Sequence, residues 1–213
     1  MKSTIPVGPP PAGGTHVPAW RRWSPGLDND DLTLREVLAT LPAAPPTAIP
    51  WIVRLFENPH GWLRLHGAVD LAHHDRIHVL LGRGLLGQDE AFVIGFTMGC
   101  TKRLSRFEQA FFKFVAANVY PQPYRIARPT LAAYDLGVEA GREIGVRNLH
   151  RAVGDDYLDR PLGDVRRALG IDPARLRAVY TRERAVLPGT AASERLPCGP
   201  PPNRPRLGQN RAA

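Results

Sequence analysis

Residues 71 to 96 constrain the fold of this chain most, because two apolar segments flank a turn rich in glycine. Each segment has the length and the residue types of a buried helix. Gly82, Gly84 and Gly87 lie between them, and glycine ends a helix at little steric cost. The sequence therefore predicts a helix, a turn, and a second helix that packs back against the first.

Four side chains with nitrogen or oxygen donor atoms interrupt this apolar stretch, namely His74, Asp75, His78 and Glu90. Because each helical residue turns by about 100°, His74 and His78 lie about 40° apart, and Asp75 lies about 60° from His78. Glu90 faces these three if the glycine turn makes the helices antiparallel. His73 points about 140° away from His78 and is left out of the predicted site.

Two imidazoles and two carboxylates suit a divalent cation. Zinc is the first expectation, and iron, manganese or cobalt fit the same donors. The alternative interpretation is a charged stripe on the surface of an amphipathic helix. The apolar neighbours on both sides favour the metal, because a carboxylate among apolar residues is costly unless it is paired or bound to a metal.

The motif resembles the signature of the ubiquinone (coenzyme Q) biosynthesis protein 4 family, which is His-Asp-x-x-His, eleven residues, and Glu. Here it reads His74, Asp75, His78 and Glu90, with the same spacing. The resemblance continues through Tyr120-Pro121, Gly141-Arg142 and residues 158–171, so it covers about residues 32 to 173. The chain departs from the family pattern in its proline-rich ends and in having no aromatic residue between Asp75 and His78.

The resemblance implies an enzyme of ubiquinone biosynthesis, a bacterial member of that family. It would remove the C1 carboxylate of a prenylated 4-hydroxybenzoate-type ring and install a hydroxyl group there. The four motif residues would be both the metal ligands and the catalytic residues. The alternative is a non-catalytic organiser that binds an isoprenoid lipid and other quinone-biosynthesis enzymes. Either role implies a cytoplasmic protein at the periphery of the inner membrane, and a homodimer stays open.

The formal charge of +8 raises the expectation of an anionic partner. Lys102, Arg103 and Arg106 form a basic cluster that either binds an anionic substrate group or is a solvated face. No nucleic-acid-binding module or zinc-finger spacing is recognisable, so nucleic acid is not the expected partner. The two cysteines lie in different contexts, which favours a reducing compartment.

The remaining patterns predict a single all-α domain. Residues 1–30 are interpreted as a flexible tail, 31–187 as the helical metal-binding domain, and 188–213 as a disordered tail rich in proline and arginine. Asp30 or Asp31 is expected to cap the first helix of the domain. The second motif helix is expected to run from Gln88 to Val119, with room for a break.

Two further patterns lie within this second motif helix. Gly95 and Gly99 stand four residues apart, which allows either a close approach of another helix or a bend. Phe107 to Val115 is strongly apolar and predicts either core packing or a tunnel for an isoprenoid tail. No apolar run is long enough to span a membrane, so peripheral contact is expected.

Overall fold

The structure, a computed structural model, describes residues 18–42, 71–101, 104–119, 125–145 and 147–199. These ranges are all-α, as predicted, and they contain no strand, only an isolated antiparallel bridge between Thr33 and Pro161. The α-helices are α1 (Ala19–Arg22), α2 (Leu34–Leu38), α4 (Leu71–Leu81), α5 (Gly87–Gly99), α6 (Arg106–Asn118), α7 (Leu131–Ile144), α8 (Leu149–Ala152), α9 (Leu162–Ala168) and α10 (Pro173–Val186). Short 3-10 helices are η2 (Arg128–Thr130), η3 (Asp155–Tyr157) and η4 (Ser193–Arg195).

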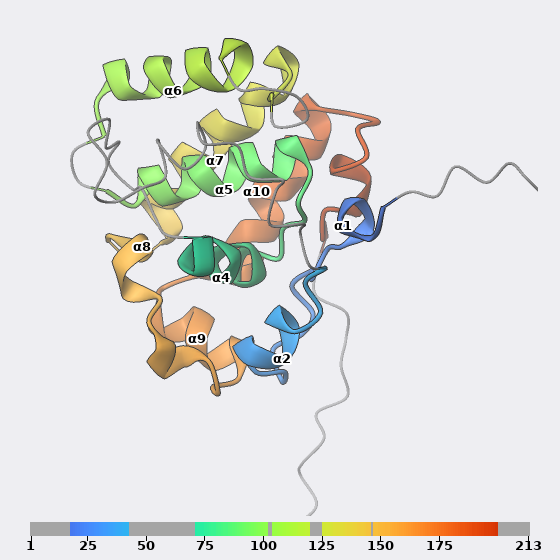
Figure 1. Ribbon diagram of the computed structural model, residues 1–213, viewed down its shortest axis with the longest axis vertical. Coiled ribbons are helices and arrows are strands. Elements are labelled where there is room, and N and C mark those ends of the chain that lie inside the picture. Colours follow the sequence, from blue (N-terminus) through green and yellow to red (C-terminus); the bar gives the residue numbers. More distant parts are fainter. Residues whose placement is uncertain (1–17, 43–70, 102–103, 120–124, 146, 200–213) are drawn as a thin grey trace, which may run out of the picture.

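The helices stack in layers, with α6 on one side of α5 and α7, and with α4 on the other side (Figure 1). The predicted helix–turn–helix is confirmed as α4, the turn and α5. Gly82 ends α4 with a φ of 66°, a left-handed conformation that glycine adopts without strain. The amide of Arg83 then donates to the carbonyl of His78 and closes the last turn of the helix.

Helices α5 and α7 pack backbone to backbone through glycines on both helices. A Cβ atom added at Gly95 or Gly99 would collide with the carbonyl oxygens of Tyr134 or Val138 on α7. Reciprocally, Gly137 and Gly141 of α7 lie against the carbonyl oxygens of Phe92 and Phe96 on α5. The close approach predicted from Gly95 and Gly99 is therefore present, and it fixes α5, which carries Glu90.

The helix expected from Gln88 to Val119 is two helices, since α5 ends at Gly99 and α6 begins at Arg106. Ser105 starts α6 with a capping box: its hydroxyl accepts from the amide of Glu108, whose carboxylate accepts from the amide of Ser105. The apolar stretch from Phe107 to Val115 packs into the core only in part. Phe112 and Val115 are buried against the core, whereas Phe107 and Phe114 are exposed.

The boundaries of the helical body differ from the prediction at both ends. Leu27, which the sequence interpretation placed in a flexible tail, is buried in the core, as are Ala192, Ser193 and Leu196 from the predicted disordered tail. Residues 188–199 are held by specific contacts, including a hydrogen bond from the Gln88 side chain to the Ser193 hydroxyl at 3.0 Å. The predicted tails at residues 18–30 and 188–199 are thus part of the folded structure.

The first helix of the domain is capped by Thr33 and not by Asp30 or Asp31. The Thr33 hydroxyl accepts from the Glu36 amide at 3.2 Å, and the Glu36 carboxylate accepts from the Thr33 amide at 2.7 Å. Asp30 instead pairs with Arg166 at 2.7 Å. None of the described helices has the length and apolar character needed to cross a membrane.

Candidate metal centre

The site lies where one turn of α4 faces the first turn of α5. His74 and His78 are one helical turn apart on α4, and Glu90 comes from the first turn of α5. Nε2 of His74 is 2.9 Å from Oε2 of Glu90 and 3.0 Å from Nε2 of His78. Nε2 of His78 is 3.3 Å from the same Glu90 oxygen. The three ligand atoms lie within 4.8 Å of one another, which is the spacing of donors around one ion.

The site is closed on the side of α4 and open on the side of Glu90. The side chain of His78 is fully buried and that of His74 is 9% exposed, whereas 31% of the Glu90 side chain is exposed. Among the described residues, the exposed part of the triad is therefore the Glu90 side chain. Sites with three protein ligands and one open direction are typical of catalytic zinc, since structural zinc has four protein ligands.

A backbone carbonyl fixes the orientation and tautomer of His78. Nδ1 of His78 donates to the carbonyl oxygen of Gly84 at 2.8 Å. Because a carbonyl can only accept, the proton of the neutral ring lies on Nδ1, and Nε2 keeps its lone pair directed at His74 and Glu90. A hydrogen bond of this kind to the distal nitrogen is the usual support of a histidine ligand.

The turn that carries Gly84 is itself held by Asp89, a buried residue of α5. One Asp89 carboxylate oxygen accepts from the Leu86 amide at 3.1 Å and lies 3.3 Å from the Arg195 guanidinium. The other oxygen lies 3.2 Å from Nε of Arg83. A Cβ at Gly84 would lie 2.7 Å from the carbonyl oxygen of Trp23, so this position has no space for a side chain.

The electrostatics of the site favour an ionised Glu90. Burial by itself disfavours the charged carboxylate, but in the metal-free site the charge that His78 carries when its Nε2 is also protonated, and the hydrogen bonds that His74 and His78 then donate, outweigh it. Together they hold the pKa of Glu90 well below its usual range. An anionic oxygen beside two imidazole nitrogens is the donor set that a borderline divalent cation prefers.

The structure brings together three of the four predicted ligands. Asp75 is not among the residues whose ligand atoms converge, although its charge interacts with those of His74, His78 and Glu90. Burial raises the pKa of the Asp75 carboxyl, and the two histidines partly offset that rise. One residue of separation on the helix is enough to turn Asp75 away from the point where the other three meet.

The predicted basic cluster is not part of this site as described. Arg106 is the exposed first residue of α6, on a different helix from any member of the triad. Lys102 and Arg103 lie outside the described residues. Sequence reasoning missed Gly84, Asp89 and Arg195. Only Gly84 left a signal, since it stands in the glycine turn.

Comparisons of this chain with protein-family models, with curated proteins and with solved structures gave no match.

Proposed function

We propose that His74, His78 and Glu90 bind one divalent cation, with zinc first and iron, manganese or cobalt as alternatives. The observation that carries the proposal is the convergence of two histidine nitrogens and a carboxylate oxygen, on two helices, within 4.8 Å. The hydrogen bond from His78 Nδ1 to the Gly84 carbonyl supports the proposal, because it leaves the lone pair of Nε2 available to bind a metal.

Such an ion, when bound, polarises substrate oxygen atoms as a Lewis acid. The protein contributes the rest. The buried imidazoles of His74 and His78 are held in place by α4, and the Gly84 carbonyl prevents His78 from rotating. Glu90 leaves one side open, through which a ring carboxylate can reach the donor atoms. Asp75 adds a further negative charge beside the site.

For the reaction, we propose the oxidative decarboxylation of a prenylated 4-hydroxybenzoate-type ring in ubiquinone biosynthesis. Dioxygen would act as the two-electron oxidant and leave as hydrogen peroxide, water would supply the oxygen atom of the new hydroxyl group, and the ring carboxylate would leave as carbon dioxide. The support is the spacing of His74, Asp75, His78 and Glu90 together with the convergence of the three triad donor atoms, of which Glu90 is partly exposed. A protein of this kind would work beside other quinone-biosynthesis enzymes, on the cytoplasmic surface of the inner membrane.

The second candidate is a non-catalytic organiser that binds an isoprenoid lipid and those enzymes. The observation that favours it is the exposed apolar surface of α6, which offers a contact area for such a lipid or enzyme. The two candidates are distinguished by turnover, since only the decarboxylase has a reaction that loss of a metal ligand would slow.

The test is an aerobic assay of the metal-loaded protein with a short-tailed prenylated 4-hydroxybenzoate, measuring carbon dioxide release and ring hydroxylation. Glu90→Gln keeps the size of the side chain but removes the anionic ligand, so turnover should fall by about 100-fold or more, in line with the loss of a metal ligand. His73→Ala, next to the triad but outside it, should retain activity. Folded, metal-loaded wild-type protein that releases no product would exclude the decarboxylase and leave the organiser.

A further inference from the structure

Helix α6 is apolar on its outward face as well as on its buried face. Phe112 and Val115 pack into the core, yet Phe107 is 77% exposed and Phe114 is 60% exposed. An ordinary surface helix has polar residues on the side opposite the core. Two exposed aromatic rings on one helix therefore indicate a surface that is covered by something in the working protein.

The outward rings form an ordered strip. Phe107, Phe111 and Phe114 follow one another at four and three residues, which places them on one side of a helix. The rings of Phe107 and Phe111 stack with their centroids 6.2 Å apart and an interplanar angle of 14°. Ala110 lies between Phe107 and Phe114 on this side of the helix and Ala117 follows Phe114, so no charged side chain interrupts the strip.

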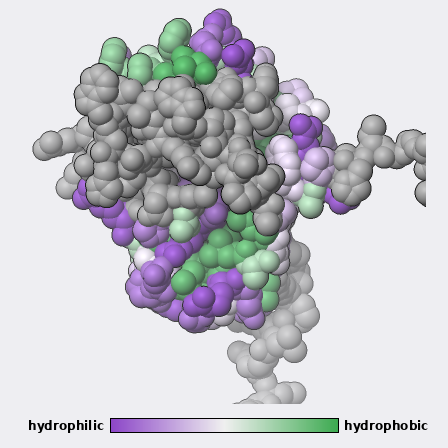
Figure 2. Space-filling model, viewed as in Figure 1, coloured by the Kyte–Doolittle hydropathy of each residue, from purple (hydrophilic) through white to green (hydrophobic). Residues whose placement is uncertain are grey.

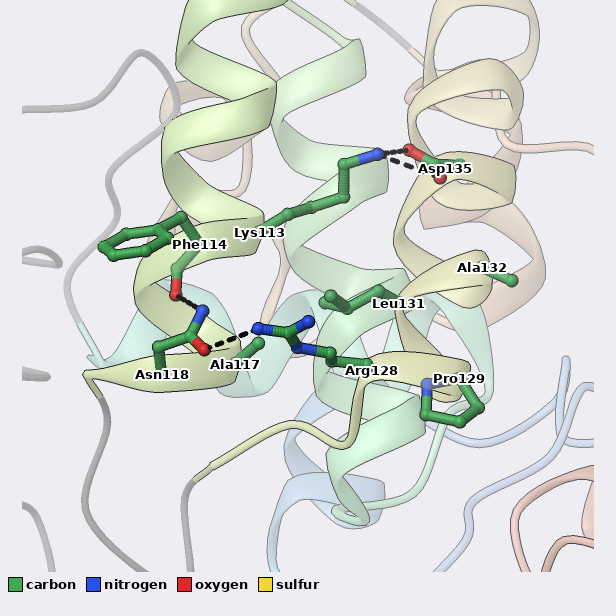
Figure 3. A pocket seen from close by; sticks show the side chains of 9 residues that line it. All are labelled: Lys113, Phe114, Ala117, Asn118, Arg128, Pro129, Leu131, Ala132 and Asp135. Atoms are coloured by element: carbon green, nitrogen blue, oxygen red, sulfur yellow. Dashed lines mark hydrogen bonds and ion pairs between the residues drawn. The ribbon is translucent and has the colours of Figure 1, made fainter.

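An open groove of about 510 Å³ lies beside the strip, between α6 and the start of α7 (Figure 3). Leu131, Ala132 and Pro129 give it an apolar lining, and Phe114 and Ala117 form its α6 side. Lys113 crosses from α6 to pair with Asp135 of α7 at 2.9 Å, and Arg128 donates to the side chain of Asn118 at 3.0 Å. The groove is apolar inside and polar at its edge.

The polar residues around the strip are predominantly cationic. Between Leu104 and Asp135 the described residues carry two acidic side chains. Glu108 accepts hydrogen bonds from the amide and hydroxyl of Ser105, and Asp135 pairs with Lys113. The same ranges carry four cations, Arg106, Lys113, Arg125 and Arg128. Apolar and strongly polar residues lie side by side along the upper edge of the molecule, where α6 is located (Figure 2).

We infer that α6 docks this protein onto a bilayer that contains anionic phospholipids. Phe107 and Phe114 insert between the headgroups, and the surrounding arginines contact the lipid phosphates. Charge complementarity favours a lipid surface over a second copy of the chain, because two copies would bring two cationic borders together. This inference rests on the proposed function in placing the protein at a membrane surface, and it adds the helix that docks there. It does not depend on the metal triad, since no α6 residue belongs to the triad.

Vesicle flotation tests the inference. The full chain should float with vesicles of phosphatidylcholine that contain about one third phosphatidylglycerol, and much less with pure phosphatidylcholine. Raising the salt from about 0.1 M to about 0.5 M should release most of the bound protein. The double variant Phe107→Ser/Phe114→Ser should bind the anionic vesicles about tenfold more weakly or worse, because two apolar anchors are lost.

Val186→Ser is the matched control, because Val186 is 56% exposed but lies on α10. It should bind like the wild type. Circular dichroism checks folding, and Phe107→Ser alone, at the most exposed position, repeats the test if the double variant does not fold. Equal binding by wild type and folded variants, or no binding by the wild type, would overturn the inference. So would a wild-type dimer that the Phe substitutions dissociate, since a second copy would then cover this face.

Discussion

At the scale of single residues, the site depends on an atom that belongs to no predicted ligand. The carbonyl oxygen of Gly84 accepts from His78 Nδ1 and so decides which nitrogen of His78 can bind a metal. Gly84 has no space for a Cβ, because Trp23 and Asp89 lie within about 3 Å of that position. The backbone conformation of the turn at Gly84 therefore determines which nitrogen of His78 carries the proton.

Gly84→Ala should weaken zinc binding by about 10- to 100-fold, because the added methyl group displaces the carbonyl that orients His78. Gly87→Ala is the matched control from the same turn, since a Cβ there meets no atom within 4 Å. Competition titration with a chromophoric chelator measures both dissociation constants. Equal affinities for the two variants would show that the Gly84 carbonyl does not support the site.

At the scale of the helices, the contact between α5 and α7 keeps Glu90 opposite His74 and His78 of α4. Gly95 and Gly99 on α5 and Gly137 and Gly141 on α7 let the two backbones touch. Rings from both helices continue the packing on either side: Phe92 meets Tyr180 of α10, and Tyr134 meets Phe112 of α6. The position of α5 therefore depends on the absence of side chains at four residues.

Gly95→Ala should destabilise the protein by about 2 kcal/mol or more, because the Tyr134 backbone must move to admit the methyl group. The same change at Gly87, on the first turn of α5, meets open space and should be neutral or stabilising by about 0.5 to 1 kcal/mol. Urea unfolding followed by circular dichroism gives both values. A Gly95→Ala protein as stable as the wild type would mean that the helices are not in backbone contact.

At the scale of the whole molecule, a buried arginine joins the metal-site turn to the C-terminal helix. Arg83 has no exposed surface and makes two hydrogen bonds to the Glu183 carboxylate, at 2.9 and 3.0 Å. Burial opposes the arginine charge, but Glu183 and Asp89 outweigh it and raise the pKa of Arg83 above its ordinary value. Gln88 extends this network to Ser193 and Thr190, beyond the end of α10.

A chain that ends at Leu187 should therefore be less stable than one that ends at Gly199, by about 3 kcal/mol or more. The shorter chain loses the buried Ser193 and leaves the polar side chains of Gln88 and Asp89 without several of their partners. Thermal unfolding of the two truncated proteins provides the comparison. Equal melting temperatures would restore the interpretation of residues 188–199 as a tail without a structural role.

The sequence was sufficient to predict the parts of the structure that depend on local spacing. The helical repeat predicts that His74 and His78 share one side of α4 and that Gly95 and Gly99 share one side of α5. Gly82 predicts where α4 ends. It was not sufficient where the partner is distant along the chain. Arg83 and Glu183 are 100 residues apart, and Arg195 meets Asp89 from 106 residues away.

Two expectations, on Asp75 and on the apolar stretch of α6, match the described residues only in part. Asp75 was grouped with the histidines because the three residues lie within about 100° around the helix axis. Donor atoms that bind one ion must lie closer together than residues that share one side of a helix. The apolar stretch of α6 was expected to lie inside the protein, because the pattern of apolar residues does not reveal which of two apolar faces meets the core.

The metal content of the purified protein decides whether His74, His78 and Glu90 form a metal site. Elemental analysis of wild type, His78→Ala and His73→Ala, purified in parallel without chelator, compares a triad histidine with a neighbouring histidine outside the triad. We expect about one divalent ion per chain in wild type and His73→Ala, and little in His78→Ala. A site with three protein ligands loses most of its metal affinity when one ligand is removed. Equal metal in wild type and folded His78→Ala, or no metal in any of the three even after loading with zinc, would contradict the assignment of this site.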